Sequence, residues 1–423
     1  MAPIVTATDA AEPDDVVVVA GTRPEAIKVA PMVLALRADS RLRPRLIAVG
    51  QHPTMVADAL AGFGLTPDDT LRIDRRDGTL AELSAQVITG LHAKFAEHRP
   101  AAVVVQGDTT TAAMAAQVAF WQRIPVVHLE AGLRSGDLDA PFPEEANRKI
   151  IGQIAALHLA PTSAATGNLA RDGITGEHVL TIGNTVVDAV TMIAGADRPC
   201  ADQRLEHAVT MARAGARRLL LVTAHRRENW GAPLDRLLSA VATLVQAHPD
   251  LEVVLPAHPN PLVNGQVHGA LGGRDRVLIT EPLPYPDLVR VLASATLVIS
   301  DSGGIQEEAP SFGVPVLVAR EVTERTEAVD AGCALLVGTD ADLIVKTATG
   351  LLADDDAHAA MTAGGNPFGD GLAAKRGTDA IAWLLGRAMG APAEFASGFA
   401  AHAGPLDRPF DAPCDQLADG DAA

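Results

Sequence analysis

The chain has 423 residues, of which 48% are hydrophobic, so it has enough apolar side chains to fill two domains rather than one. Its net charge of −18 argues against nucleic-acid binding, which requires a basic face. Residues 1–15 contain no basic segment followed by an apolar core, and no apolar run is long enough to span a membrane. The three cysteines are far apart and fit neither a disulfide framework nor a zinc site. We therefore expect a cytoplasmic protein.

Short β-branched runs alternate with helical stretches in the first half of the chain, which is typical of βαβ units and a parallel sheet. The runs are almost continuously apolar, which indicates that both faces of the sheet are buried. The predicted strands are Val16–Ala20, Arg45–Gly50, Ala101–Gln106, Ile124–Glu130 and the run ALHLAP.

A second series of strands follows a helical stretch between Asp188 and Arg217 that is rich in alanine and charge, and we place a domain junction there. The predicted strands of this series are Arg218–Thr223, Leu251–Pro256, Arg276–Thr280, Ala295–Ser300, Val314–Ala319 and the run ALLVG. A helix around Thr378–Met389 closes the folded part. We predict a flexible N-terminus (1–14), a first Rossmann-like domain (15–188) completed by the helix at about 372–390, a second one (189–371) and a disordered tail (391–423).

Nearly every unusual polar cluster comes directly after one of the predicted strands. In open α/β sheets, ligands bind outside the carboxyl ends of the strands. The sequence therefore predicts an α/β protein whose two Rossmann-like, parallel-sheet domains face a cleft, where these clusters converge.

The first polar cluster, GTRPEAIK, opens a helix after the strand Val16–Ala20. Pro24 suits the first helical turn. Arg23 and Lys28 place two cations at the positive end of the helix dipole, which is unfavourable unless an anion binds there. Solvated basic residues are the alternative, but the position at the end of a strand favours a phosphate or substrate site.

A second cluster, SDSGGIQEEAP, begins where a strand of the second series ends. Gly303 and Gly304 let the backbone approach a bound group, and Ser302 can cap the helix or bond an oxygen. Of the two acids in the first turn, we assign Glu307 to the helix dipole and Glu308 to ribose hydroxyls. The cluster is neither a P-loop nor the GxGxxG of NAD proteins, which argues against a nicotinamide cofactor.

Three acids follow strands of the first half. Asp108 in QGDTTTAA precedes a helix, where an N-cap is the alternative to a catalytic role. Glu130 ends a buried strand, where a charge is costly unless it is used or paired. Glu144 opens a further helix in PFPEEANRK, and an ordinary surface pair with Arg148, four residues on, is the alternative there.

Histidines follow two strands of the second series. The segment VTAHRREN delivers His225 to the edge of the cleft, opposite several acids, which makes it a candidate for acid–base work rather than a structural histidine. His258 in PAHPNP is similarly placed. The acids and histidines lack a metal-binding spacing, so we expect no metal.

Together these segments resemble the bacterial, non-hydrolysing UDP-N-acetylglucosamine 2-epimerase family. The matching strings run in order from Gly21 to Gly371: GTRPEAIK, GQH, QGDTTTAA, HLEAGLRSGD, PFPEEANR, GNTVVDA, VTAHRREN, PAHPNP, SDSGGIQEEAPSFGVPVL, TERTEAV and NPFGDG. The resemblance implies a fold like that of GT-B glycosyltransferases, a UDP-sugar substrate, no cofactor and a homodimer.

The resemblance also implies a reaction in which UDP leaves the anomeric carbon, a 2-acetamidoglucal forms, and UDP returns after carbon 2 is reprotonated on its other face. Its catalytic residues would be Asp108, Glu130 and Glu144 for the carbon 2 proton and His225 for departure and return of UDP, with Lys28 helping to bind and orient the ligand. Which acid serves which face stays open.

The resemblance further implies the residues that hold the ligand. Substrate or UDP would contact Arg23, Arg148, Ser302, Gly303, Gly304, Glu308 and Arg325. A second UDP-N-acetylglucosamine, an activator of some bacterial members, would contact Gln51, His52, Arg226 and His258. The chain departs from the family pattern at Thr326, where proline is usual, and at Leu288, where some members have an aromatic side chain near the uracil.

Four other functions stay open at this point. A hydrolysing epimerase that releases N-acetylmannosamine and UDP would share the fold and most site residues. An epimerase for a variant sugar, such as a diacetamido-uronate, would need an extra cation. A GT-B glycosyltransferase would need an acceptor site and would not explain three clustered carboxylates. A non-catalytic UDP-sugar-binding protein would not need those acids or His225.

Overall fold

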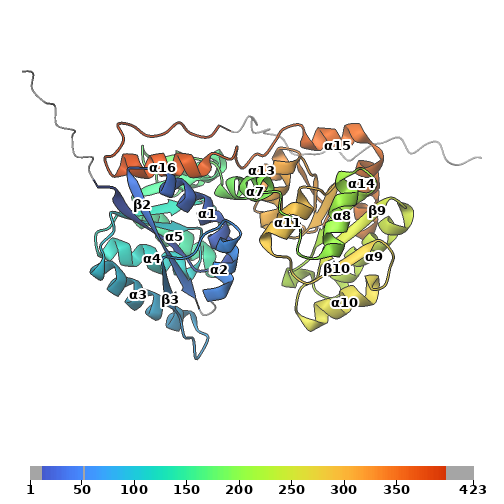
Figure 1. Cartoon of the computed structure of the whole chain (residues 1–423), viewed down its shortest axis with the longest axis horizontal. Helices are drawn as coiled ribbons and strands as arrows, with labels where there is room; N and C mark the ends of the chain where they lie inside the picture. The colour runs from blue at the N-terminus through green and yellow to red at the C-terminus, as the bar shows by residue number, and fades with distance from the viewer. Residues whose placement is uncertain (1–11, 51–52, 397–423) are drawn as a thin grey trace, which may run out of the picture.

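The computed structural model describes residues 12–50 and 53–396, which form two α/β halves side by side (Figure 1). The strands of the first half are β1 (Asp14–Ala20), β2 (Leu42–Gly50), β3 (Asp69–Arg72), β4 (Ala102–Gln106), β5 (Val126–Leu129), β6 (Leu157–Ala160) and β7 (Val179–Thr181). Its helices are α1 (Arg23–Ala38), α2 (Pro53–Ala61), α3 (Leu80–Glu97), α4 (Thr110–Trp121), α5 (Glu144–Ile154), α6 (Ser163–Arg171) and α7 (Thr185–Gly195).

The second half alternates in the same way. Its strands are β8 (Arg218–Thr223), β9 (Leu251–Pro256), β10 (Val277–Thr280), β11 (Leu297–Ser300), β12 (Val316–Val318) and β13 (Ala334–Leu336). Its helices are α8 (Gln203–Arg213), α9 (Ala232–Ala247), α10 (Pro261–Leu271), α11 (Tyr285–Leu292), α12 (Gly303–Glu308), α13 (Thr326–Asp330), α14 (Ala341–Ala353) and α15 (Asp355–Thr362), with 3₁₀ turns η1 (Arg227–Asn229) and η2 (Ala309–Phe312). The helix that follows them in the chain is α16 (Ala373–Leu384).

The two sheets have the same topology. The seven-stranded sheet has the order β3-β2-β1-β4-β5-β6-β7, the six-stranded sheet has the order β10-β9-β8-β11-β12-β13, and their strands pair in parallel. In each sheet the strand order reverses next to the first strand, at β1/β4 and at β8/β11. Ligands bind at such switch points in doubly wound sheets. The predicted fold of two Rossmann-like sheets is confirmed.

Two strands, β3 and β7, were not expected from the sequence. Both lie at edges of the seven-stranded sheet. β3 alternates half-buried and exposed residues, and β7 has only three residues, so neither shows the continuous apolar pattern of a central strand.

The apolar side chains of the central strands pack on both faces of each sheet. Val16 and Val18 of β1 belong to one core cluster, whereas Val17 and Val19 belong to the cluster on the opposite face. This alternation is what successive side chains of a strand produce when helices cover both faces.

Helix α7 lies between the halves (Figure 1) and contributes to the cores of both. Its Ala189 and Val190 pack with the core around β1, whereas Val186 and Val187 pack with the core around β8. The helix therefore joins the two halves through buried apolar contacts as well as through the chain.

Helix α16 returns the chain to the first half (Figure 1), where Ile381 packs in the same core cluster as Val16. It spans Ala373–Leu384, which lies within the predicted range of about 372–390 but begins and ends earlier than the stretch Thr378–Met389. Its first amide groups are capped from a distance, because Asp188 on α7 accepts hydrogen bonds from the backbone of Ala373 (3.3 Å) and Ala374 (2.9 Å). Burial raises the pKa of Asp188 to about 6.

The ends of the chain correct two predictions. Asp14, placed in the flexible N-terminus, opens β1. Residues 391–396, placed in the disordered tail, are held on β7, because Glu394 accepts a hydrogen bond from the backbone N–H of Thr181 (2.7 Å) and Phe395 is buried. The remainder of the tail, 397–423, lies outside the described residues. Within 12–50 and 53–396, no helix is both long and apolar enough to cross a membrane.

Candidate active site

A cavity of about 470 Å³ opens between the two halves, at the carboxyl ends of both sheets. α1 contributes Arg23 and Lys28 to its wall, and the second half contributes His225, Ser302 and Arg325. These five residues were predicted from the sequence, and the structure brings them together around one space. The volume lies in the range of small-molecule sites.

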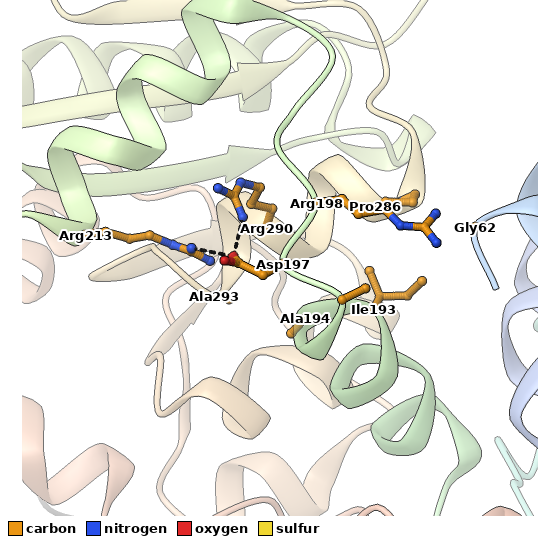
Figure 2. A pocket seen from close by; sticks show the side chains of 10 residues that line it. Gly62, Ile193, Ala194, Asp197, Arg198, Arg213, Pro286, Arg290 and Ala293 are labelled. Atoms are coloured by element: carbon orange, nitrogen blue, oxygen red, sulfur yellow. Dashed lines mark hydrogen bonds and ion pairs between the residues drawn. The ribbon is translucent and has the colours of Figure 1, made fainter. Parts of the chain in front are cut away.

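A much smaller hollow of about 20 Å³ lies where the end of α7 meets α8 and α11 (Figure 2). It has room for about one water molecule. Asp197 accepts hydrogen bonds there from Arg213 (2.8 Å) and Arg290 (2.7 Å), so two of its arginines are already paired. This hollow is not the substrate site.

The turn between β1 and α1 is fixed by a buried acid. Glu25 accepts hydrogen bonds from the backbone N–H of Gly21 (2.9 Å) and the hydroxyl of Thr109 (2.7 Å), which ties this turn to the turn after β4. Arg23 Nη2 then reaches across the cleft and donates to the carbonyl of Leu283 (2.9 Å). The turn that presents Arg23 and Lys28 is therefore held by polar contacts at the switch point of the sheet.

Lys28 lies at the centre of an ion-pair network that spans both halves. Its ammonium pairs with Glu130 from the first half and with Glu307 from the second half, at 3.1 Å. Glu307 in turn accepts a hydrogen bond from Arg325 Nε (2.9 Å). Burial opposes the charge of Lys28, but the two carboxylates outweigh it and hold the pKa of the amine above its ordinary value.

Glu130 is held in an unusual backbone conformation directly after β5. Its φ of 64° lies in the left-handed region, which non-glycine residues rarely adopt outside strained or functional sites. Its carboxylate accepts hydrogen bonds from Gln106 and from Asn184 (3.4 Å) in addition to its pair with Lys28. The carboxylate is therefore held in place by three side chains, from α1, β4 and the residue that precedes α7.

Asp108 pairs with an arginine and does not cap the next helix. The N-cap of α4 is Thr109, which corrects the alternative that Asp108 caps this helix. Arg148 contacts Asp108 at 2.6 Å and pairs with Glu145 at 3.0 Å. The suggested surface pair between Glu144 and Arg148 is therefore replaced by a pair with the buried neighbour Glu145.

A buried histidine supports the loop that carries Asp108. His128 Nε2 contacts the carbonyl of Gly107 (2.8 Å), and burial lowers the pKa of the imidazole to about 3. The ring is therefore neutral and donates its Nε2 proton to that carbonyl. This role of His128 could not be predicted, because the residue lies within a buried strand among apolar residues.

His225 is half exposed and faces the cavity, and a buried aspartate holds its ring. Its Nδ1 lies 3.0 Å from Asp301 Oδ1. Asp301 also accepts hydrogen bonds from the backbone of His225 and Arg226 and from Asn229. Burial works against its charge, yet His225 and these donors keep the pKa of Asp301 below its ordinary value. Asp301 was missed, although a carboxylate directly after a buried strand is a signal that could have found it.

The start of α12 corrects one assignment. Glu307 is not a solvated acid that complements the helix dipole: it is 2% exposed and pairs with Lys28 and Arg325. Arg325 lies close over Gly303, since a methyl group added there would be 3.2 Å from its Cζ. Gly304 faces the cavity and has more open space.

Glu308 and Tyr285 lie side by side in the cavity wall. Neither Glu308 Oε2 nor the Tyr285 hydroxyl has a hydrogen-bond partner in the described part of the chain, and both atoms are buried. Burial, together with the charge of Glu307, raises the pKa of Glu308 to about 8. Leu288 lines the same cavity.

The predicted site residues fall into three groups. Arg23, Lys28, His225, His258, Ser302, Gly304, Glu308 and Arg325 line the cavity. Glu130 and Gly303 do not line the cavity themselves, but each contacts a residue that does: Glu130 pairs with Lys28, and Gly303 lies against Arg325. Asp108, Glu144 and Arg148 are not among the lining residues.

The residues suggested for an activator site are only partly placed. Gln51 and His52 lie outside the described residues. Arg226 Nε donates to the carbonyl of Asp301 (2.9 Å), and His258 accepts a hydrogen bond from the backbone of Asn260 (3.0 Å). Among the described residues, no group of three or more histidine, cysteine, aspartate or glutamate side chains has the geometry to hold a metal.

Comparisons with known proteins place the chain in a family. The model of the UDP-N-acetylglucosamine 2-epimerase family matches residues 34–382. The UDP-N-acetylglucosamine 2-epimerase of Yersinia pestis is 43% identical over 362 residues, which cover 85% of this chain and 96% of that protein.

Solved structures agree with this assignment. S. aureus MnaA, solved with UDP, superposes with a TM-score of 0.81 at 36% identity and covers 90% of this chain and 100% of its own. The enzyme from Neisseria meningitidis, bound to UDP-GlcNAc, superposes with a TM-score of 0.77 at 36% identity and covers 85% of this chain and 97% of its own. The chain belongs to the UDP-N-acetylglucosamine 2-epimerase family.

Proposed function

We propose that this protein interconverts UDP-N-acetylglucosamine and UDP-N-acetylmannosamine without hydrolysing either. The observation that carries the proposal is the cluster of Lys28, Glu130 and Arg325, in which cations and a carboxylate from two halves meet at one cavity. Membership of the family and the complexes of its members with UDP and UDP-GlcNAc support the choice of substrate.

The chemistry requires the diphosphate to leave before the carbon 2 proton becomes acidic. Carbon 2 is not adjacent to a carbonyl, so its proton is removed only as positive charge develops at the anomeric carbon. A carboxylate then takes that proton, and the products are UDP and a 2-acetamidoglucal, both held in the cleft. Reprotonation on the other face and return of UDP invert carbon 2. The reaction needs cations for the diphosphate and acids or bases on both faces of the sugar ring.

We assign the carbon 2 proton to Asp108, Glu130 and Glu144. Glu130 is the best supported of the three, because it contacts Lys28 in the cavity wall and sits in a strained backbone conformation. The other two lie outside the cavity wall and would act on a sugar that extends from the cavity toward α5.

The diphosphate would lie between residues of the two halves. Lys28 and Arg325 supply positive charge, and the backbone around Gly304 has space for a close approach of phosphate oxygens. His225, oriented by Asp301, would assist departure and return of UDP. Glu308 would bind the ribose, and Arg23 and Arg148 would orient the ligand.

Three further assignments are also proposals. The halves would act as domains of residues 14–188 and 189–371, with α16 packing on the first. The protein would form a homodimer, for which Phe120 and Trp121 at the end of α4, 53% and 58% exposed, offer apolar surface for a second copy. The location would be cytoplasmic.

Proton NMR in deuterated water tests the reaction. Purified protein is mixed with UDP-N-acetylglucosamine, without added NAD or metal. Deuterium at carbon 2 and UDP-N-acetylmannosamine at equilibrium are the expected result. Release of free N-acetylmannosamine and UDP would replace the proposal by a hydrolysing epimerase. Absence of exchange, with and without a large excess of UDP-N-acetylglucosamine as activator, would refute this substrate.

A further inference from the structure

Glu307 connects the two halves through charge. It belongs to α12 in the second half, and its Oε2 lies 3.1 Å from Lys28 Nζ on α1 of the first half. Its Oε1 accepts a hydrogen bond from Arg325 Nε (2.9 Å). The side chain is 2% exposed, so water does not screen these contacts as it would at the surface.

We propose that Glu307 is a positioning residue that sets Lys28 and Arg325 side by side for the diphosphate, and that it does so only when the two halves are closed. The inference rests on the proposed function, since it concerns the same cavity. It adds Glu307, which lies in the cavity wall, as a residue that acts through the two cations.

The charge pattern explains why a carboxylate is needed here. Lys28 and Arg325 repel each other, and their side chains are only 11% and 16% exposed, so their charges need nearby partners. Glu130 provides one partner for Lys28, but it belongs to the first half and cannot align Lys28 with a cation of the second half. Glu307 is the group that contacts both cations. A negative charge beside a diphosphate does not favour binding. Glu307 would therefore contribute by aligning the two cations and not by attracting the diphosphate.

The geometry of the contact between Glu307 and Lys28 also allows Lys28 to leave Glu307 for a phosphate. Glu307 Oε2 has no aligned hydrogen bond in the described part of the chain, so its contact with Lys28 is an ion pair by distance alone. The ammonium can therefore turn toward a phosphate oxygen without breaking a hydrogen bond to Glu307. Arg325, in contrast, is hydrogen-bonded through Nε, which leaves its two terminal nitrogens available.

The contact with Lys28 depends on closure because it crosses between the halves. Other polar contacts cross in the same way, among them those in which Arg23 donates to the carbonyl of Leu283 and Thr162 donates to Glu327 at 2.7 Å. Separation of the halves would break all three. Of these three, the Glu307 contact is the one that joins Lys28 to the partner of Arg325, so it links closure to assembly of the diphosphate site.

The test compares Glu307→Gln with Glu327→Gln. Both changes remove a carboxylate of the second half that reaches the first half, but Glu327 contacts neither cation. We expect Glu307→Gln to lower kcat by about tenfold or more while KM and the Kd for UDP change by less than about threefold. Glu327→Gln should keep kcat within about twofold. Equal kcat for Glu307→Gln and wild type would overturn the inference.

A double variant tests whether Glu307 acts through Lys28. If it does, Glu307→Gln should lower kcat little further in a Lys28→Met background, whereas full additivity of the two effects would overturn the inference. Should Glu307→Gln fail to fold, Glu307→Asp keeps the charge with a shorter reach. Its kcat should fall by about threefold or more, and wild-type kcat would again count against the inference.

The activity of the wild type distinguishes failure of this inference from failure of the proposed function. If the wild type does not epimerise UDP-N-acetylglucosamine, the proposed function is wrong. The inference is then judged on UDP alone, by small-angle scattering: wild type should become more compact on adding UDP, and Glu307→Gln less so. The same compaction in both proteins would overturn the inference.

Discussion

Glu308 makes the stability of the ligand-free protein depend on pH near neutrality. The carboxyl is 7% exposed, and burial beside Glu307 raises its pKa to about 8, from an ordinary value of 4.5. Between these two pH values the folded state holds a proton that the unfolded state has released. The free energy of unfolding is therefore highest below pH 4.5 and falls as the pH rises toward 8.

The size of this effect follows from the uptake of one proton, which changes the free energy of unfolding by about 1.4 kcal/mol per pH unit. Between pH 6 and pH 8 the free energy of unfolding should therefore fall by about 2 kcal/mol. Glu308→Gln keeps the shape of the protonated acid and removes the titration. The free energy of unfolding of this variant should rise relative to wild type by about the same 2 kcal/mol over that pH range. Other titrating groups cancel in the difference, because both proteins contain them.

Guanidinium denaturation of both proteins at pH 6, 7 and 8, followed by circular dichroism without UDP, measures this difference. Glu327→Gln is the matched control, and its curve should run parallel to that of the wild type. If the curve for Glu308→Gln is also parallel to the wild type, Glu308 is already charged at pH 6, and the reasoning from its burial fails.

Three further changes probe other parts of the structure. Asp108→Asn should abolish deuterium exchange at carbon 2 while the Kd for UDP by calorimetry stays within about threefold, and retained exchange would remove Asp108 from the mechanism. Truncation after Gly390 removes the buried Phe395 and should lower the free energy of unfolding by about 2 kcal/mol, whereas truncation after residue 396 should leave it unchanged. Equal melting curves for the two truncated proteins would show that Phe395 adds no stability. Gly303→Ala should displace Arg325, whose Cζ would lie 3.2 Å from the new methyl group, and lower kcat by several-fold; unchanged kcat would mean that Arg325 has room to move.

The strands and the loops after them were predictable because their signals are local. The β-branched run Val16–Ala20 and the turn that follows it fold at the place and in the order that the sequence indicates. Edge strands such as β7 escaped prediction because they are short and their pairing is decided by the neighbouring strand. The buried Phe395 escaped for a related reason, since the segment around it has no periodicity and is ordered by the edge on which it lies.

Helix α16 shows that a capping residue far along the chain cannot be identified from the local sequence. No side chain of its own caps its first turn, so the sequence around Leu372 carries no start signal. The cap comes from Asp188 on α7, which is buried between the halves. The sequence therefore predicts the helix at about 372–390, but the source of its cap becomes visible only when the connection between the halves is known.

The two neighbouring acids of α12 show where prediction of the site stops. Glu307 and Glu308 share the same turn, and both are almost fully buried. Glu307 meets Lys28 and Arg325 and keeps its charge, whereas Glu308 meets Tyr285 and the negative charge of Glu307 and takes up a proton more readily. Since Lys28 comes from the other half of the molecule, the packing of the two halves decides which acid is charged. A sequence motif can therefore locate the acids of such a site, but their protonation states depend on closure of the cleft.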